Sequence, residues 1–277
     1  MRCCKTLHLF FVIMNFMNKT DFARELFNLY GPVTRARDCF LYTKKGVRIT
    51  DMYQEDGRAI LGWQGGSAFT HLKNVLSRGQ TGSFICEESS RLQKAISQLL
   101  ASDRKIFFFS DKVCAMKAAI KISQKGTSIY IPWAVPQKIN SEIDCMVIAP
   151  PLPWTDTIFI LAVKANLIEE NSQLQGQIYL PFVMQTAITR ATYNLIQAIQ
   201  ERSEKDWFIY DQVLTKYFER NGPYLCCKVP EKKYDDFVRF CLKLGIAINP
   251  DYNKHSIVPF GADKGAFTSL KNSPFAY

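Results

Sequence analysis

The stretch FFFSDKVCAMKAAIKISQKG, residues 107–126, decides how the fold of this chain is interpreted. Its three phenylalanines are typical of a buried strand, and the alanine-rich part predicts a helix that ends at Gly126. Many phosphate-binding sites consist of a strand, a tight turn and a helix, because the free N–H groups of the first helical turn bind the anion. The turn Ser110-Asp111-Lys112 contains no glycine. Three interpretations are therefore open: a cofactor site, the remains of one, or an ordinary strand–helix corner.

Apolar runs alternate with helical patterns on both sides of this stretch. Four runs have the composition of buried strands: KIFFFS, TSIYIPW, IDCMVIAP and TIFILAV. Strands that alternate with helices indicate a mainly parallel sheet with both faces covered. The segment PPLPW must be a loop, because proline cannot donate a hydrogen bond to a sheet. We therefore predict an α/β fold with a reduced, mainly parallel sheet and flanking helices.

The flanking segments predict the rest of the organisation. A helix over 21–30 ends at Gly31-Pro32, and a hairpin turns at Lys45-Gly46. Two long helices are expected over about 182–203 and 206–220. After them, a helix capped by Gly245 and two short strands form a small α+β C-terminal subdomain. The predicted division is an extension (1–16), an N-terminal arm (17–86), a reduced large domain (87–180), and long helices with the subdomain (181–277).

Composition narrows the class of protein. The 277 residues are 47% hydrophobic, which is enough for one large domain or two smaller ones. The net charge is +10, but Lys and Arg are scattered and form no basic run with interleaved aromatic residues. Nine cysteines without a C-x-x-C pair predict free thiols in a reducing compartment, and the three histidines lie far from any zinc-like cluster. We expect a cytoplasmic protein that binds neither metal, nucleic acid nor membrane.

Residues 1–16 have a basic start and an apolar stretch that Asn15 interrupts. Three interpretations fit: an upstream or disordered extension ahead of Met17, a short signal peptide, or a packed element. No small-x-small cleavage site follows, and the stretch is too short to span a bilayer. The extension is favoured, because a capped amphipathic helix begins directly after Met17.

Three stretches resemble the class III aminotransferases, which are fold-type-I enzymes that use pyridoxal phosphate (PLP). Residues 38–76 are similar to the family's opening, in which a hairpin leads to a glycine-rich stretch, a histidine and a helix. Residues 107–123 are similar to the strand–turn–helix FxxSGxEAxxAAxKxA, whose turn holds the cofactor phosphate. Residues 234–267 resemble the small C-terminal domain. The resemblance implies a PLP-transferase-like fold and a homodimer with its active site at the interface.

The resemblance also assigns candidate site residues. If PLP chemistry is retained, it implies that Ser110 and Lys112 bind the phosphate, Asp144 pairs with the pyridine nitrogen, and Lys164 forms the Schiff base. Asp111 replaces the glycine of the phosphate turn and brings a negative charge there. The chain is shorter than the family's members, with the missing length between residues 130 and 165. The glycine-rich sequence that follows the family's lysine is absent.

Each candidate also has a purely structural interpretation. Ser110 is expected to cap the helix, with Asp111 stabilising the positive end of its dipole. Lys164 fits an exposed strand end, and Asp144 fits a turn. His71 matches a family histidine but fits a structural role, and Arg190 fits a solvated helix face.

Three functions follow. The first is an aminotransferase-like protein that has lost PLP catalysis, holds no cofactor, and acts as a dimeric binding or structural protein. The second is a minimal PLP-dependent aminotransferase that uses Lys164; it requires Lys164, Asp144 and Ser110 to lie in one pocket. The third is a basic α/β protein that binds nucleic acid or an anionic surface.

Overall fold

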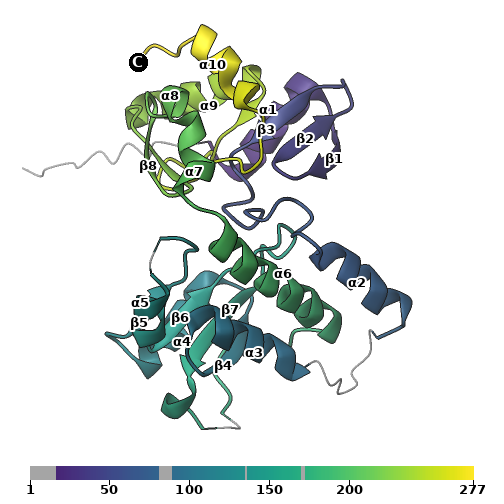
Figure 1. Ribbon diagram of the computed structural model, residues 1–277, viewed down its shortest axis with the longest axis vertical. Coiled ribbons are helices and arrows are strands. Elements are labelled where there is room, and N and C mark those ends of the chain that lie inside the picture. The colour runs from purple at the N-terminus through teal and green to yellow at the C-terminus, as the bar shows by residue number, and fades with distance from the viewer. Residues whose placement is uncertain (1–16, 81–88, 135, 170–171) are drawn as a thin grey trace, which may run out of the picture.

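The computed structural model describes residues 17–80, 89–134, 136–169 and 172–277, which form two lobes stacked along the long axis (Figure 1). The chain begins in the upper lobe and crosses to the lower lobe ahead of helix α2 (Ala68–Ser77). It returns to the upper lobe after helix α6 (Phe182–Glu201). The interpretations of residues 1–16 concern a segment outside the described residues.

A four-stranded sheet forms the centre of the lower lobe. Its order is β4-β7-β6-β5, with bounds Arg104–Phe109 (β4), Phe159–Lys164 (β7), Cys145–Ile148 (β6) and Thr127–Ile129 (β5). The mixed α/β class is confirmed, but only β5 and β6 pair in parallel, while β7 is antiparallel to both of its neighbours. The sheet is thus mixed in direction and not mainly parallel, for a simple reason. Only residues 149–158 join β6 to β7, and a parallel crossover needs a dozen or more residues.

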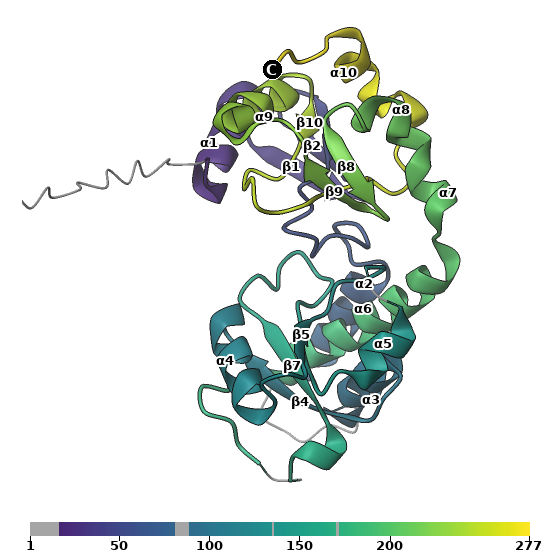
Figure 2. The same ribbon diagram turned by 90° about the vertical axis from the view of Figure 1, so that its left-hand side faces the viewer.

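Helices cover both faces of this sheet (Figure 2). One face carries α4 (Lys112–Ile122), and the other carries α3 (Ser89–Leu100) and α6, with α5 (Gln137–Glu142) beside α3. The pleat of β6 serves both layers: Cys145 and Val147 belong to the apolar core under α4, whereas Met146 and Ile148 belong to the core under α3 and α6. Since α6 packs in this lower core, the predicted boundary between residues 180 and 181 does not follow the packing.

The upper lobe contains a second sheet of order β1-β2-β3-β10. Its helix α1 (Lys19–Tyr30) precedes β1 (Val33–Arg37), β2 (Phe40–Thr43), β3 (Arg48–Asp51) and β10 (Ile246–Ala247). The hairpin predicted at Lys45-Gly46 is confirmed as the antiparallel pair of β2 and β3, whereas β1 was not expected. Because β10 pairs in parallel with β3, the two ends of the chain share one sheet and one core.

The second long helix predicted over 206–220 is wrong. The segment forms α7 (Glu204–Trp207), the 3₁₀ turn η2 (Phe208–Tyr210), α8 (Asp211–Leu214) and strand β8 (Phe218–Asn221). Gly222 and Pro223 form the turn of a hairpin to β9 (Tyr224–Cys227), which β11 (Ser256–Ile257) extends. The same residues signal a helix end or a hairpin turn, and the following strand, YLCC, decides between them.

The remaining elements complete the upper lobe. They are η3 (Glu231–Lys233), α9 (Tyr234–Lys243), η4 (Lys264–Phe267) and α10 (Thr268–Asn272), and one more 3₁₀ turn, η1 (Ala165–Leu167), follows β7. Gly245 follows α9 with a φ of 75°, as expected of a residue that ends a helix. Asp263 precedes η4 and forms an ion pair of 2.8 Å with Arg48.

The described cysteines have no disulfide partner, and Cys39, Cys145 and Cys241 are buried. Within the described ranges there is no group of three or more His, Cys, Asp or Glu side chains that could hold a metal ion. In the same part of the chain, no helix has the length and apolar character that crossing a bilayer requires.

Candidate functional site

The corner between β4 and α4 holds the proposed phosphate turn. Asp111, and not Ser110 as expected, is the N-cap: its carboxylate accepts the backbone N–H of Cys114 at 2.8 Å. Hydrogen bonds from Cys114 lower the pKa of the Asp111 carboxyl group, so it is negatively charged at neutral pH. Ser110 and Lys112 are exposed on either side of it. The end of α4 is thus capped by the chain's own anion.

Lys164 and Asp144 form an ion pair of 3.1 Å. Lys164 Nζ also donates to the carbonyl of Glu142 at 2.7 Å, and Asp144 accepts from the Ser123 hydroxyl at 2.9 Å. Hydrogen bonds from Lys164 and Ser123 lower the pKa of Asp144. The pair joins the end of β7 to the turn before β6, which is a structural arrangement.

Ser110 and Lys112 lie at one end of the strands of this sheet, whereas Lys164 and Asp144 lie at the other end. Lys164 is opposite Arg104 at the start of β4, whereas Phe159 is opposite Phe109 at its end, next to Ser110. The five intervening steps of an antiparallel strand span about 17 Å. The minimal aminotransferase requires Ser110, Asp144 and Lys164 to share one pocket, and this arrangement keeps Ser110 apart from the other two because β7 runs antiparallel to β4.

The edge next to Ser110 is where α/β sheets usually bind ligands, outside the carboxyl ends of parallel strands. There β6 continues into Ala149, Pro150 and Pro151, and residues 149–158 contain no lysine. On the adjacent strand, β5 continues into Tyr130 and Trp133. This edge, which we call the carboxyl edge, has aromatic residues and prolines where a Schiff-base enzyme would present a lysine.

Arg58 connects the upper lobe to the carboxyl edge. Its side chain is 6% exposed and its guanidinium lies 4.7 Å from the centre of the Phe159 ring. It donates to three oxygen atoms: the Thr155 hydroxyl at 3.1 Å, the Asp156 carbonyl at 3.3 Å and the Ile158 carbonyl at 3.2 Å. Burial lowers the pKa of Arg58 to about 10, so the group remains protonated at neutral pH. The upper-lobe loop is therefore hydrogen-bonded directly to the β6–β7 connection.

A left-handed turn positions Arg58. Gln54, Glu55 and Asp56 have φ values of 47°, 48° and 57°, and Gly57 follows at 89°. Such a run is costly for residues with a Cβ atom, so other contacts must stabilise it. The buried carboxylate of Asp51 accepts the N–H groups of Tyr53 and Gln54 and, through its other oxygen, the indole N–H of Trp63.

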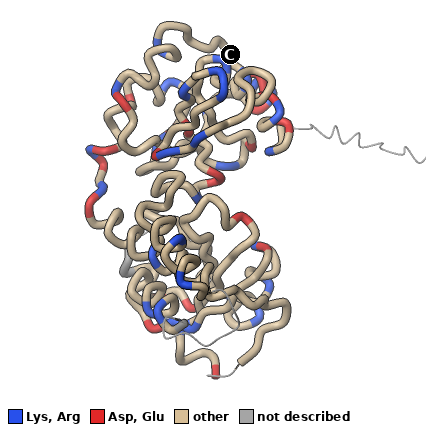
Figure 3. Tube along the Cα trace, turned by 90° about the vertical axis from the view of Figure 1, so that its right-hand side faces the viewer, with Lys and Arg blue, Asp and Glu red and all other residues tan. Residues whose placement is uncertain are grey.

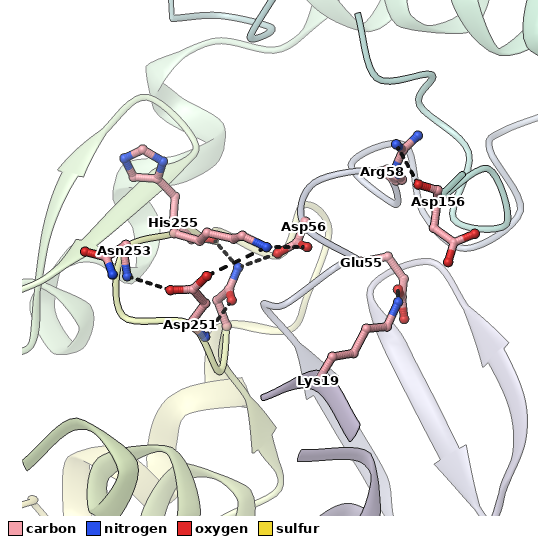
Figure 4. A network of polar contacts seen from close by, with 10 residues as sticks. Lys19, Glu55, Asp56, Arg58, Asp156, Asp251, Asn253 and His255 are labelled. Atoms are coloured by element: carbon pink, nitrogen blue, oxygen red, sulfur yellow. Dashed lines mark hydrogen bonds and ion pairs between the residues drawn. The ribbon is translucent and has the colours of Figure 1, made fainter. Parts of the chain in front are cut away.

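Ion pairs hold the two acidic side chains of this turn from opposite sides (Figure 4). Glu55 pairs with Lys19 of α1, and Asp56 pairs with Lys254 at 3.0 Å. Asp56 also accepts the side-chain amide of Asn249 at 3.0 Å. The turn is thus attached to both the N-terminal and the C-terminal part of the upper lobe.

Arg202, directly after α6, makes a second connection between the lobes. It donates to the carbonyl of Ile60 at 2.9 Å and lies 3.7 Å from the centre of the Phe260 ring. Trp133 of the lower lobe contacts Trp207 of the upper lobe edge to face, with 5.7 Å between ring centres. The two tryptophans therefore pack the lobes against each other at this point.

The sequence did not reveal Arg58 or Arg202 as important residues. An arginine inside an apolar run, as in GRAILGW, is the signal that favours burial with partners. Arg190 instead donates to the Ser67 hydroxyl at 2.7 Å and is exposed, as expected. His71 lies in the first turn of α2, where its N–H binds the carbonyl of Ser67.

Basic and acidic residues alternate along the described part of the chain. Figure 3 shows Lys and Arg interspersed with Asp and Glu over both lobes. Several of the basic side chains are engaged in ion pairs. The distribution gives no separate support to a nucleic-acid interface.

Comparison with solved structures identifies the fold. The chain superposes on the ornithine aminotransferase of Plasmodium yoelii with a TM-score of 0.64 and 10% identity, covering 87% of this chain and 91% of that chain. The acetylornithine aminotransferase of Elizabethkingia anophelis superposes with a TM-score of 0.61 and 10% identity, covering 92% of this chain and 97% of that chain. An omega-transaminase of Sphaerobacter thermophilus superposes with a TM-score of 0.60 and 11% identity, covering 90% of this chain and 97% of that chain. The PLP-transferase-like fold expected from the sequence is thereby confirmed.

Sequence comparison adds one relative of unknown role. An uncharacterized protein of Treponema pallidum (strain Nichols) is 24% identical over 280 residues, which cover 85% of this chain and 91% of the relative. No family model matches the sequence. The aminotransferase likeness is therefore one of fold.

The residues present do not fit a PLP molecule held in the way that the sequence resemblance implies. The helix N-terminus that would hold the phosphate is capped by Asp111, whose negative charge repels a dianion. The Lys164–Asp144 pair lies at the other end of the strands, and the buried Arg58 is hydrogen-bonded to the β6–β7 connection beside the carboxyl edge.

Replacing Arg58 with alanine is expected to destabilise the protein by roughly 3 kcal/mol, because carbonyl groups of the β6–β7 connection lose a charged donor in a buried place. Urea unfolding followed by tryptophan fluorescence measures the effect. The control is Arg24→Ala, since that side chain is 69% exposed and its change should cost less than about 0.5 kcal/mol. Equal losses in both variants would contradict the assigned role of Arg58.

The buried carboxylate of Asp51 predicts a pH-dependent stability. Burial raises the pKa of Asp51 from 3.8 to about 6, against the opposing effect of its hydrogen bonds. The folded protein therefore binds a proton more tightly than the unfolded chain, so stability falls as pH rises from about 4 through 6. Relative to the Asp51→Asn variant, the free energy of unfolding of the wild type should fall by up to about 3 kcal/mol over this pH range and change little above pH 7.

Urea unfolding of both proteins at steps between pH 4.5 and 7.5 measures this difference. A difference that stays constant with pH, or that favours the wild type as pH rises, would show that Asp51 is not a buried carboxyl group with a raised pKa.

Proposed function

We propose that this protein is an aminotransferase-like protein without PLP catalysis, which acts as a dimeric binding or structural protein. The observation that supports it most directly is the separation of Ser110 from the Lys164–Asp144 pair at opposite edges of the sheet. A Schiff-base lysine must lie beside the phosphate site to reach the same cofactor, and Lys164 does not meet this condition.

This arrangement argues against Lys164 as the Schiff-base lysine of a minimal aminotransferase. Lys164 is engaged by Asp144 and by the Glu142 carbonyl, and Lys112 is the one lysine of the turn next to the carboxyl edge. The loss of PLP binding is supported by the sequence and by this geometry together. The shortened middle of the chain and the cytoplasmic location are parts of the proposal that rest on the sequence alone.

Incubation with PLP followed by borohydride tests the loss of Schiff-base chemistry. We expect the visible spectrum of free PLP and, after reduction, low-level labelling spread over exposed lysines in peptide mass spectra. Lys164→Ala should behave like the wild type, because Lys164 has no role in cofactor binding. One stoichiometric adduct on a single lysine, with a band that borohydride abolishes, would overturn the proposal.

The proposed homodimer is supported by the fold and by exposed apolar side chains on α2. Phe69 and Leu76 are 45% and 48% exposed on this helix, whose buried residues face α6. Light scattering after size exclusion should give about twice the 31.8 kDa of the chain. Phe69→Glu with Leu76→Glu should shift the mass to that of a monomer, whereas Val113→Glu, a change of another exposed apolar residue, should not. A monomeric wild type would contradict this part of the proposal.

A further inference from the structure

A cavity of about 290 Å³ lies at the β5 end of the carboxyl edge, on the face of the sheet that α3, α5 and α6 cover. The size is at the lower limit of small-molecule sites. Its described lining residues are uncharged: Leu99, Tyr130, Trp133, Pro136, Asn140, Ile196, Ile199 and Gln200. The cavity is separate from the β4–α4 corner, because α4 packs on the opposite face of the sheet.

One hydrogen-bond donor on the cavity wall is buried without a partner. It is the indole N–H of Trp133, which makes no hydrogen bond within the described residues. Because native proteins contain few such groups, this one beside a cavity calls for an explanation. The Tyr130 hydroxyl is not among the buried unpaired atoms, but it makes no hydrogen bond to another described residue and so can donate one to a ligand.

The backbone at Trp133 is also held in an unfavourable conformation. Its φ is 60°, in the left-handed region that residues with a Cβ atom rarely adopt. Two side chains contact the Trp133 ring there: the ring of Trp207 in the upper lobe lies 5.7 Å away, and the guanidinium of Arg202, directly after α6, lies 5.9 Å away, both measured to the centre of the Trp133 ring. The two lobes together therefore position this wall of the cavity.

The lining defines the chemistry of an occupant. Tyr130 and Trp133 provide flat aromatic surfaces, and Leu99, Ile196 and Ile199 provide aliphatic ones, which favours a planar apolar body. The indole N–H of Trp133 can only donate a hydrogen bond and the Tyr130 hydroxyl can also donate one, so an occupant that pairs with both carries an acceptor such as a carbonyl oxygen or a ring nitrogen. A charged ligand finds no counter-charge among the described lining residues.

We propose that this cavity is a binding site for a neutral, planar heteroaromatic compound whose carbonyl oxygen or ring nitrogen accepts hydrogen bonds from Tyr130 and Trp133. The site is independent of the loss of PLP catalysis, since it is away from the β4–α4 corner and includes none of the residues assigned to the cofactor, which are Ser110, Lys112, Asp144 and Lys164.

The indole N–H signals of ¹⁵N-tryptophan-labelled protein provide a direct test. The chain has four tryptophans, and Trp133→Phe identifies the signal of Trp133. The probe is isoquinolin-1(2H)-one, a neutral planar lactam, and the control compound is its saturated decahydro form, which keeps the carbonyl but is not planar. We expect saturable shifts of the Trp133 signal with a dissociation constant of about 1 mM or lower, as suits a ligand of this size. The saturated lactam should bind at least tenfold more weakly.

Variants separate the cavity from other surfaces. Ile199→Phe should fill the cavity and weaken probe binding at least tenfold, whereas Ile120→Phe, on the exposed face of α4, should leave it unchanged. Tyr130→Phe removes one donor with little change of shape and should weaken binding several-fold, which provides a second test if Ile199→Phe does not fold. Two results would overturn the proposal. One is the absence of any shift of the Trp133 signal up to several millimolar probe, and the other is that the Ile199→Phe and Tyr130→Phe variants both bind the probe as tightly as the wild type does.

Discussion

A guanidinium buried between two lobes needs acceptors on the lobe it enters, and this requirement organises the molecule. Arg58 belongs to the upper lobe, but its three acceptors, at Thr155, Asp156 and Ile158, belong to the lower lobe. To deliver the side chain, residues 54–57 adopt a left-handed turn, which the buried Asp51 stabilises through the N–H groups of Tyr53 and Gln54. The cost of the buried charge and of the unusual backbone is offset only while the lobes stay together. The space beside the carboxyl edge is thereby occupied by protein groups.

The direction of one strand determines what the sheet can do. The short connection after β6 makes β7 return antiparallel, so the end of β7 lies beside the start of β4. Lys164 is thus carried to the edge opposite Ser110, where it forms a structural ion pair with Asp144. The fold of the aminotransferases is present, whereas the corner at α4 is closed by its own cap, Asp111. Fold and chemistry are separable because the chemistry needs a few groups at one place.

Local patterns predicted much of the architecture: the β2–β3 hairpin, the β4–α4 unit, the proline loop and α6 all follow from turn residues and periodicity. The errors were of two kinds. The segment 206–220 contains a helical period but ends as strand β8, because pairing with YLCC outweighs local preference. The site could not be derived from the order of residues along the chain. Asp144 precedes Lys164, as the resemblance requires, but both residues lie at the end of the strands that is far from Ser110. Arg58 and the cavity at Trp133 depend on contacts between distant segments, which no local pattern encodes.

A crystal structure of the protein grown with excess PLP tests the central claim most directly. The account predicts density for the Arg58 guanidinium hydrogen-bonded to Thr155, a capped α4 N-terminus at Asp111, and no cofactor between the lobes. A PLP molecule with its phosphate at the start of α4 and Arg58 displaced from Thr155 would contradict it, because the carboxyl edge would then be a working cofactor site.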